Sequence, residues 1–298
     1  MTLIIDPALP QWKGNLHCHT TNSDGKLTPR EAAALYRAAG YDFLSITDHR
    51  RVTDPREAES DLLLLPGLEL DYHVMGRHRQ AVHLIGVGVD DRLMDEPQVL
   101  TSPQQGIDLI RAHSGLAIFA HPAWSLNEPE TIEGLQNISA VEIYNHVSDA
   151  PWNAPRGDSS LILDECFSDG CLLPVVAGDD AHHYNGDQCH SAVIACAEAC
   201  TREGILSALA QGHVYASQGP RITEMRFSDG VLSLSCSPCR QIIFFSNMFY
   251  GRGRVITGAG ITQAAYQVQP AETFVRVEIT DEQGLRAWSS PIPVGSKV

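Results

Sequence analysis

The chain has 298 residues, of which 43% are hydrophobic and 19% are charged, and its formal net charge is −15 at pH 7. This composition is typical of a globular protein, and the length suits one large domain with a small one. The acidic balance, without a basic stretch, excludes duplex nucleic acid and anionic membranes as general partners, and an anionic substrate would need bound cations. Because no basic, apolar leader and no run near ~20 apolar residues occurs, we expect a cytoplasmic protein.

The stretch from Gly14 to Gly25, with the sequence GNLHCHTTNSDG, contains three candidate metal ligands. On an extended strand, His17 and His19 would project their imidazoles to one face, because alternate residues share a face. Asp24 follows in a Ser-Asp-Gly turn that can present its carboxylate beside the end of the strand. A His-x-His pair also occurs as ordinary polar side chains, so this stretch alone leaves metal binding and a structural role open.

The next predicted elements are a helix and a strand. Residues 28–31 have the sequence of a capping box with proline at the first helical position, and Gly40 ends the helix. Residues 41–47 are predicted to form a strand that ends at Asp48 and His49. A second pair of potential ligands therefore lies at a strand end.

Two apolar runs contain isolated polar side chains. Glu69 stands among leucines after the Pro66–Gly67 break. Burying an unpaired carboxylate there would cost free energy. We therefore expect a metal ion or an ion partner beside it, or a half-exposed position at a strand edge. His83 lies inside the predicted strand 81–89, where a hydrogen-bonded core histidine is the alternative to a ligand.

Three more predicted strands each run into polar residues, and helices separate them. These strands span residues 116–120, 141–145 and 171–177, and the helices span residues 102–115, 158–168 and 201–211. The polar residues at the strand ends are His121, Asn145 and the run Gly178-Asp179-Asp180-Ala181-His182.

The alternation of strands with helices over roughly the first 220 residues predicts parallel β/α units. In a β/α barrel the C-terminal ends of the strands share one rim, where residues distant in sequence meet. We therefore expect the candidate ligands to form a single cluster at such a rim.

From residue 219 onward the pattern changes to alternating strands without a helical period. We expect residues 1–218 to form the α/β domain and residues 219–298 to form a small antiparallel β domain without candidate ligands. Cys236 and Cys239 form a C-x-x-C pair in this region, but no second pair and no histidine follows. We interpret them as two thiols, and the eight cysteines of the chain as free thiols.

Six short motifs, taken together and in this order, resemble the polymerase and histidinol phosphatase (PHP) superfamily from Asn15 to His182. They are HCHTTNSDG, ITDH, GLEL, HLIG, AHP and GDDAH. The runs VEIYN, PVVAGDDAH and GHVYASQGP are similar to the CehA/McbA branch of metallohydrolases. The resemblance implies an α/β fold, namely the distorted (β/α)7-type TIM-like barrel of PHP proteins, followed by the small β domain.

The resemblance also implies a multinuclear metal centre in which a glutamate bridges two ions and a third ion has its own ligands. The first ion is assigned to His17, His19, Glu69 and Asp180, the second to Glu69, His83 and His121, and the third to Asp24, His49 and His182. Nitrogen and oxygen ligands without thiolate suit manganese, zinc or iron, so we expect two or three such divalent ions.

Other residues of the motifs receive supporting roles. Asp48 and Asp179 neighbour ligands and are interpreted as carboxylates that orient the ligand imidazoles, and Asn145 as a substrate contact. The implied reaction is hydrolysis of a small phosphate ester, such as a nucleotide or sugar phosphate, by a metal-bridging hydroxide and without a catalytic side chain. An ester, amide or carbamate hydrolase with the same metals is the alternative, and a non-catalytic metal-binding module is a second alternative.

Overall fold

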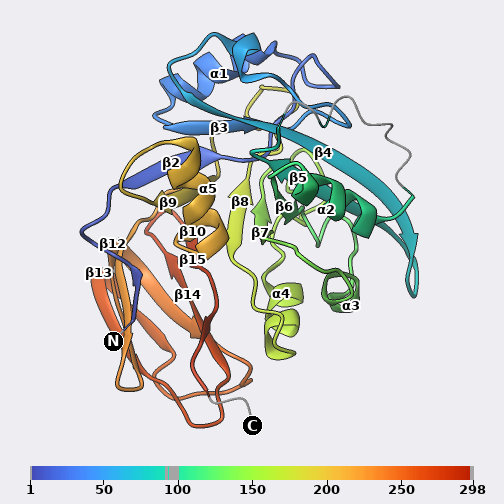
Figure 1. Ribbon diagram of the computed structural model, residues 1–298. Coiled ribbons are helices and arrows are strands. Elements are labelled where there is room, and N and C mark those ends of the chain that lie inside the picture. The colour runs from blue at the N-terminus through green and yellow to red at the C-terminus, as the bar shows by residue number, and fades with distance from the viewer. Residues whose placement is uncertain (1, 91–92, 94–100, 296–298) are drawn as a thin grey trace.

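Figure 1 shows the computed structural model, which describes residues 2–90, 93 and 101–295. The helices are α1 (Pro29–Ala38), η1 (Pro55–Ala58), α2 (Pro103–Ala112), α3 (Pro129–Glu133), α4 (Ser160–Ser168) and α5 (Arg202–Gln211). The first strands are β1 (Thr2–Ile5), β2 (Gln11–Asn15), β3 (Phe43–Ile46), β4 (Leu63–Met75), β5 (Arg79–Val87), β6 (Leu116–Phe119), β7 (Ala140–Asn145) and β8 (Val175–Gly178). The later strands are β9 (Ala192–Cys196), β10 (Val214–Ser217), β11 (Ile222–Ser228), β12 (Val231–Phe245), β13 (Val255–Gln267), β14 (Phe274–Thr280), β15 (Arg286–Ser289) and β16 (Ile292–Pro293).

Two sets of parallel strands bring their C-terminal ends together. β2, β3 and β4 form one parallel set, and β6, β7 and β8 form the other. Beyond the strand ends, the backbone N–H of His19 donates to the carbonyl of Ala181 at 2.9 Å, and that of Asp180 donates to His17 at 2.8 Å. These bonds join the segment after β2 to the segment after β8, so residues far apart in sequence become neighbours.

The mixed α/β fold expected from the sequence is confirmed, but the prediction of parallel units is wrong at β5. This strand runs antiparallel to both β4 and β6. Only residues 76–78 separate β4 from β5. Such a short connection makes a hairpin, whereas a parallel crossover needs a dozen or more residues.

The helices begin as their sequences predict and pack on the sheet. Thr28 accepts a hydrogen bond from the backbone of Glu31, whose side chain accepts one from the backbone of Thr28, which completes the capping box of α1. Ile107 and Ile110 of α2 are fully buried in the apolar core that lies against β5 and β6. None of the described helices is long and apolar enough to cross a membrane.

The strands after residue 219 are antiparallel, as expected, but their hydrogen bonds continue into the rest of the sheet. β12 pairs with β11, β13 and β14. β15 pairs with both β14 and β10, and β1 pairs with β11. Figure 1 shows these strands in orange and red below the helix-covered part of the molecule. Their independence as a domain with a boundary near residue 219 stays a prediction.

Arg276 on β14 links these antiparallel strands to α4. Its side chain is fully buried, and its Nε and Nη2 donate to the two carboxylate oxygens of Asp164 at 2.6 and 2.7 Å. The guanidinium also lies 4.1 Å from the centre of the Phe245 ring. A buried guanidinium needs such a partner, because an unpaired charge in this position is strongly destabilising.

We predict that Asp164→Asn lowers the free energy of unfolding by about 2 kcal/mol, because it removes the carboxylate that pairs with two nitrogens of a buried arginine. Urea unfolding followed by circular dichroism measures this loss. The matched control is Asp108→Asn on α2, an exposed helical aspartate, which should change stability by less than about 0.5 kcal/mol. Equal midpoints for the two variants would show that the Asp164–Arg276 pair does not hold these elements together.

Candidate metal centre

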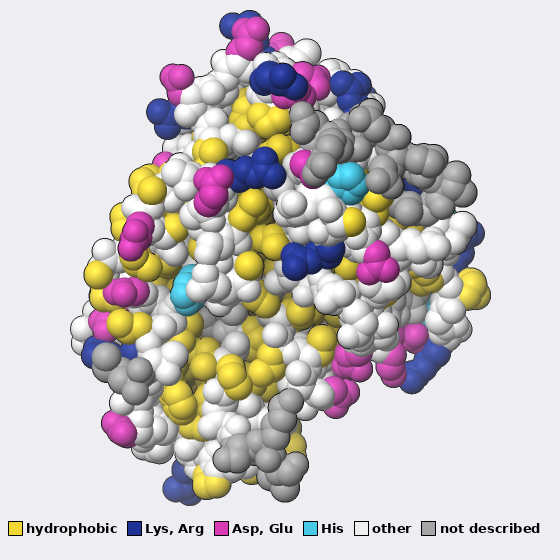
Figure 2. Space-filling model, viewed as in Figure 1, with side chains coloured by type: hydrophobic (Ala, Val, Ile, Leu, Met, Phe, Trp, Pro, Cys, Tyr) yellow, Lys and Arg dark blue, Asp and Glu magenta, His cyan; other side chains and the backbone are white. Residues whose placement is uncertain are grey.

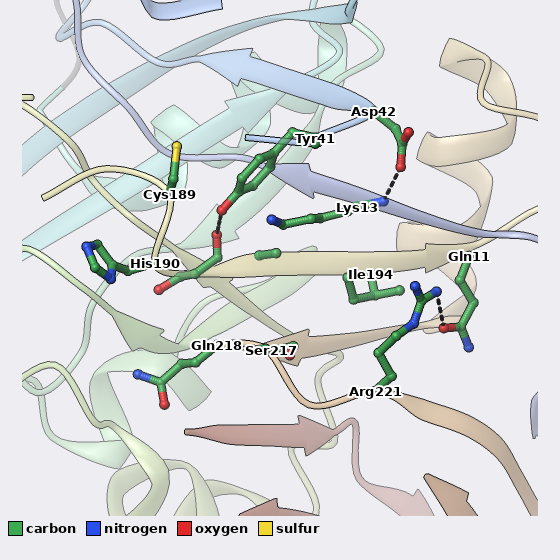
Figure 3. Close-up of a pocket in the computed structure, with 14 residues that line it drawn as sticks. Gln11, Lys13, Tyr41, Asp42, Cys189, His190, Ile194, Ser217, Gln218 and Arg221 are labelled. Carbon is green, nitrogen blue, oxygen red and sulfur yellow. Dashed lines mark hydrogen bonds between the residues drawn. The ribbon is translucent and has the colours of Figure 1, made fainter. Parts of the chain in front are cut away.

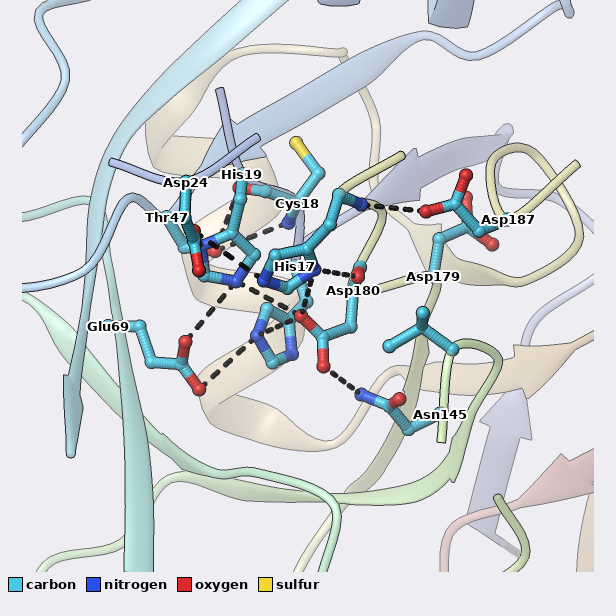
Figure 4. Close-up of polar contacts among 12 residues, drawn as sticks. His17, Cys18, His19, Asp24, Thr47, Glu69, Asn145, Asp179, Asp180 and Asp187 are labelled. Carbon is cyan, nitrogen blue, oxygen red and sulfur yellow. Dashed lines mark hydrogen bonds and ion pairs between the residues drawn. The ribbon is translucent and has the colours of Figure 1, made fainter. Parts of the chain in front are cut away.

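The segments that follow β2 and β8 place two histidines and an aspartate in contact (Figure 4). His17 Nε2 and His19 Nε2 lie 3.2 and 3.0 Å from Asp180 Oδ1. Both imidazoles are fully buried, and Asp180 is 7% exposed. His17 and His19 therefore point toward the same carboxylate, as expected. Both lie just beyond the end of β2 rather than within it.

Glu69 on β4 stands between two sets of histidines. Its Oε1 lies 2.8 Å from His83 Nδ1 and 3.4 Å from both His17 Nε2 and His121 Nε2. Its Oε2 lies 3.2 Å from His19 Nε2 and 3.2 Å from His49 Nδ1. The two oxygens of this carboxylate therefore face different imidazoles, and its proposed role as a bridge between two ions stays a prediction.

A third group of ligand atoms surrounds Asp24. Its Oδ1 lies 3.6 Å from His182 Nε2 and 3.7 Å from His19 Nδ1, and its Oδ2 lies 3.8 Å from His49 Nε2. The side chain of Asp24 is 55% exposed, whereas Glu69 is 1% exposed. The structure therefore brings together all nine residues that the sequence analysis named as ligands, with the Asp24 group at the solvent side.

The donor atoms of this cluster fit divalent cations. Nε2 of His17, both ring nitrogens of His19, Nδ1 of His49 and Oδ1 of Asp180 are buried and form no hydrogen bond with the described residues. Such unmet buried polar atoms are costly. The closest nitrogen–oxygen separations among them, 3.0 and 3.2 Å, match neighbouring ligands on an ion with bonds of about 2.0–2.2 Å.

The electrostatics of the cluster keep its carboxylates ionised. Burial alone would raise the pKa of Asp180, but His17, His19 and His182 hold this pKa well below its usual range. Burial alone would lower the pKa of His19, but Asp180 and Glu69 raise it to about 9. Without another cation, protonated imidazoles balance the buried carboxylates, so metal binding would release protons and depend on pH.

Two of the candidate ligands have backbone conformations that side chains rarely adopt. The φ angle of His121 is 29° and that of Asp180 is 54°. Non-glycine residues in this region carry strain that the surrounding structure must hold, and such residues are concentrated at functional sites. The strain supports a functional role for this cluster.

Glu142 on β7 is a supporting residue that the sequence analysis missed. Its Oε1 lies 3.0 Å from His17 Nδ1, and its Oε2 accepts hydrogen bonds from the backbone of His121 at 2.9 Å and from Asn145 Nδ2 at 3.0 Å. An irregularity in the β7–β8 pairing between Glu142 and Tyr144 brings Glu142 and Asn145 to the same side. The isolated carboxylate in the apolar run VEIYN was the available signal.

Asn145 itself is fully buried. Its amide group also lies 3.3 Å from Asp180 Oδ2, and its Oδ1 accepts a hydrogen bond from the backbone of Ser148. In the structure it therefore positions a candidate ligand, and a direct contact with substrate stays a prediction.

The expected role of Asp48 in orienting an imidazole is wrong. Its carboxylate accepts hydrogen bonds from the backbone and hydroxyl of Thr20 at 2.7 and 2.8 Å and from the Ser23 hydroxyl at 2.8 Å. Thr53 donates a further hydrogen bond. Asp48 thus holds the loop between His19 and Asp24, because the polar groups of that loop need a partner.

Asp179 likewise anchors a loop instead of an imidazole. Its carboxylate accepts three backbone hydrogen bonds from residues 189–191, at 2.6 to 3.0 Å, and one from the Tyr36 hydroxyl at 2.8 Å. Burial raises the pKa of Asp179 to about 7 despite these bonds. The partners of the ligand imidazoles are other groups, such as Ser125 Oγ at 2.9 Å from His121 Nδ1.

Seven of the nine candidate ligands, all except the buried His17 and His19, line a cleft with a volume of about 280 Å³. Besides candidate ligands, its walls contain Trp124, Val147, Ser148, Asn153 and His183. The Trp124 indole lies edge-on to the rings of His83 and His121, with centroids 5.7 and 4.9 Å apart, and its Nε1 donates to Asn153 Oδ1 at 3.2 Å. No lysine or arginine is among the described residues that line this cleft.

No protein-family model matches the chain. Over 83 residues, which are 26% of this chain, the sequence is 34% identical to a 5′-3′ exoribonuclease from Haemophilus influenzae. That match spans 29% of the length of the exoribonuclease.

Solved structures extend the comparison to the whole chain. An amidohydrolase from Chromobacterium violaceum has a TM-score of 0.45 and 17% identity, over 58% of this chain and 89% of its own. A two-domain protein from Bacteroides vulgatus, which contains a predicted PHP-like metal-dependent phosphoesterase, has a TM-score of 0.55 and 15% identity over 96% of both chains. The chain therefore shares its overall fold with this two-domain protein.

Proposed function

We propose that the protein is a metal-dependent hydrolase of the PHP superfamily that acts on a small phosphate ester, such as a nucleotide or sugar phosphate. The observation that carries this proposal is the clustering of nine potential ligands, seven of which line one cleft, together with buried ligand atoms that form no hydrogen bond among the described residues. The fold shared with a protein that contains a PHP-like phosphoesterase supports it. The narrower CehA/McbA branch, the closed TIM-like barrel and the separate β domain are parts of the same proposal.

Three overlapping sets of residues would hold the ions. The ligand assignment is the one that the motifs imply. In addition, the two ring nitrogens of His19 belong to different groups of ligand atoms, because Nδ1 lies near Asp24 and Nε2 lies near Asp180. Manganese, zinc and iron all suit this set of nitrogen and oxygen donors. Such ions, when bound, would make a coordinated water acidic, align the phosphate and offset the charge that develops on its oxygens.

The protein's own side chains would orient these ligands and the substrate. Glu142 accepts a hydrogen bond from Nδ1 of His17, which leaves Nε2 of that ring free to bind a cation at the centre. Trp124 and Asn153 form a hydrogen-bonded wall of the cleft and would contact the substrate. A flat group on the substrate would pack on the indole.

An ester, amide or carbamate hydrolase that uses the same centre is the second candidate. The observation that favours it is the absence of lysine and arginine among the described lining residues, since basic side chains commonly bind phosphate. In the phosphoesterase, the cations alone would offset the substrate charge. The third candidate is a non-catalytic metal-binding module, which would hydrolyse neither a phosphate ester nor an ester, amide or carbamate.

Activity assays with alternative substrates distinguish these candidates. The purified protein is assayed with nucleoside monophosphates, short single-stranded RNA, sugar phosphates, carboxyl esters and aryl carbamates, each with manganese, zinc and iron. The phosphoesterase proposal predicts turnover of at least one phosphate ester that a chelator abolishes. Turnover of carboxyl esters or carbamates alone would replace it with the second candidate, and metal binding without any turnover would indicate the module.

We predict that Glu69→Gln impairs activity more than Asp24→Asn, because Glu69 contacts two sets of histidines and Asp24 serves only the exposed group. Glu69→Gln should lower kcat/KM by about 100-fold and reduce bound metal. Asp24→Asn should mainly raise KM and retain turnover. Steady-state kinetics with metal quantification measures both. Equal losses at unchanged metal content would mean that Glu69 is not the bridge.

We further predict that Glu142→Gln weakens metal binding about tenfold, because the amide cannot support the His17 ring and the backbone of His121 as the carboxylate does. Competition with a chelating dye measures the dissociation constant. The matched control is Glu165→Gln, an exposed glutamate on α4. The same constant in both variants would argue that Glu142 does not support the metal centre.

A further inference from the structure

A second pocket lies where β2, β9 and β10 run side by side, and it shares no lining residue with the cleft of the metal centre (Figure 3). Its volume is about 230 Å³. Pockets for drug-sized ligands measure about 300–1,000 Å³, so this one suits a small metabolite or ion. We call it the Lys13 pocket and define it by Gln11, Lys13, Tyr41, Ser191 and Arg221.

Two cationic side chains line this pocket, the half-buried Lys13 and the exposed Arg221. Among the described residues, neither Lys13 nor Arg221 forms an ion pair with a carboxylate, although the chain carries a net charge of −15. Lys13 Nζ lies 3.8 Å from the centre of the Tyr41 ring and 3.4 Å from the carbonyl of Ala39. Arg221 Nη2 donates to Gln11 Oε1 at 3.0 Å. Burial lowers the pKa of Lys13, and the nearby Cys189, Asp179 and Asp42 only partly oppose this shift.

A buried hydroxyl in the same pocket lacks a partner. Ser191 is 1% exposed, and its Oγ forms no hydrogen bond in the part of the chain that the structure describes. Its backbone is fixed on both sides, because its N–H donates to Asp179 at 2.7 Å and its carbonyl accepts from the Tyr41 hydroxyl at 2.7 Å. The hydroxyl of this lining residue is therefore buried with its hydrogen-bonding capacity unused, which is costly unless a small rotation of the side chain brings it to a ligand.

The one carboxylate in the lining, that of Asp42, forms no ion pair with Lys13 or Arg221 among the described residues. Asp42 Oδ2 accepts a hydrogen bond from the backbone N–H of Lys13 at 2.8 Å, so it is engaged by the main chain. Charged donors and a hydroxyl in one small pocket suit the binding of an oxyanion. The several oxygens of an oxyanion can accept hydrogen bonds from donors on different sides.

We propose that the Lys13 pocket is a second ligand site, in which Lys13, Arg221 and the Ser191 hydroxyl bind a small oxyanion such as a phosphate group. The ligand is either free phosphate or the phosphate of a small metabolite. The site does not depend on the proposed function, because it shares no lining residue with the cleft of the metal centre.

Calorimetric titration of the metal-loaded protein with inorganic phosphate, and separately with glycerol phosphate, tests this site. The double variant Lys13→Gln/Arg221→Gln should lose one binding event, with at least tenfold weaker affinity, and keep its metal content. The control Arg240→Gln/Arg252→Gln removes two exposed charges outside the pocket and should titrate like the wild type. Tighter binding of glycerol phosphate than of phosphate would identify an organic ester as the ligand, and the reverse would identify free phosphate.

A second variant distinguishes a loss of binding from a folding defect of the double variant. Ser191→Ala removes a hydroxyl without a hydrogen-bond partner among the described residues, so the protein should fold normally and bind phosphate several-fold more weakly in the pocket. Equal stoichiometry and affinity in Ser191→Ala, the double variant and the control would overturn the proposal. The two proposals can fail separately. If the wild-type protein hydrolyses no phosphate ester, but binds phosphate at a site that the double variant lacks, the proposed function is refuted and this site stands.

Discussion

The burial of two carboxylates among histidines is the constraint around which the structure is arranged. Glu69 is 1% exposed and Asp180 is 7% exposed, and the imidazoles of His17 and His19 between them are fully buried. Removing such charges from water is costly unless opposite charges and hydrogen bonds surround them. The parallel strands satisfy this requirement, because their C-terminal ends deliver ligands from separate parts of the sequence to one place. The backbone strain at Asp180 and the buried ligand atoms without hydrogen bonds indicate that side chains alone do not meet this requirement fully.

Further buried carboxylates fix the segments that carry the ligands. Asp48 holds the loop between His19 and Asp24, Asp179 holds residues 189–191, and Glu142 accepts from the backbone at His121. Each carboxylate satisfies backbone N–H groups that would otherwise be buried without partners. The candidate metal centre is therefore preorganised by an outer layer of acidic groups, which also explains part of the acidic composition of the chain.

Much of the centre could be predicted from the sequence, because ligand positions follow from local patterns at strand ends. His17, Glu69 and Asp180 each stand at or within an apolar run, where a polar side chain is conspicuous. The antiparallel course of β5 could not be predicted from its apolar run, because it follows from the short connection after β4, whose end at Met75 has no clear signal in the sequence. The pairing of β15 with β10 and the roles of Asp48 and Asp179 depend on contacts between distant segments, which no local pattern reports.

Crystals of the protein grown with manganese, and measured for anomalous scattering, test the metal centre most directly. We predict anomalous peaks among the side chains of His17, Glu69 and Asp180, with at least one further peak between Glu69 and the pair His83 and His121. Crystals of metal-loaded protein whose anomalous map has no peak at these side chains, or has its peaks elsewhere in the molecule, would contradict the assignment.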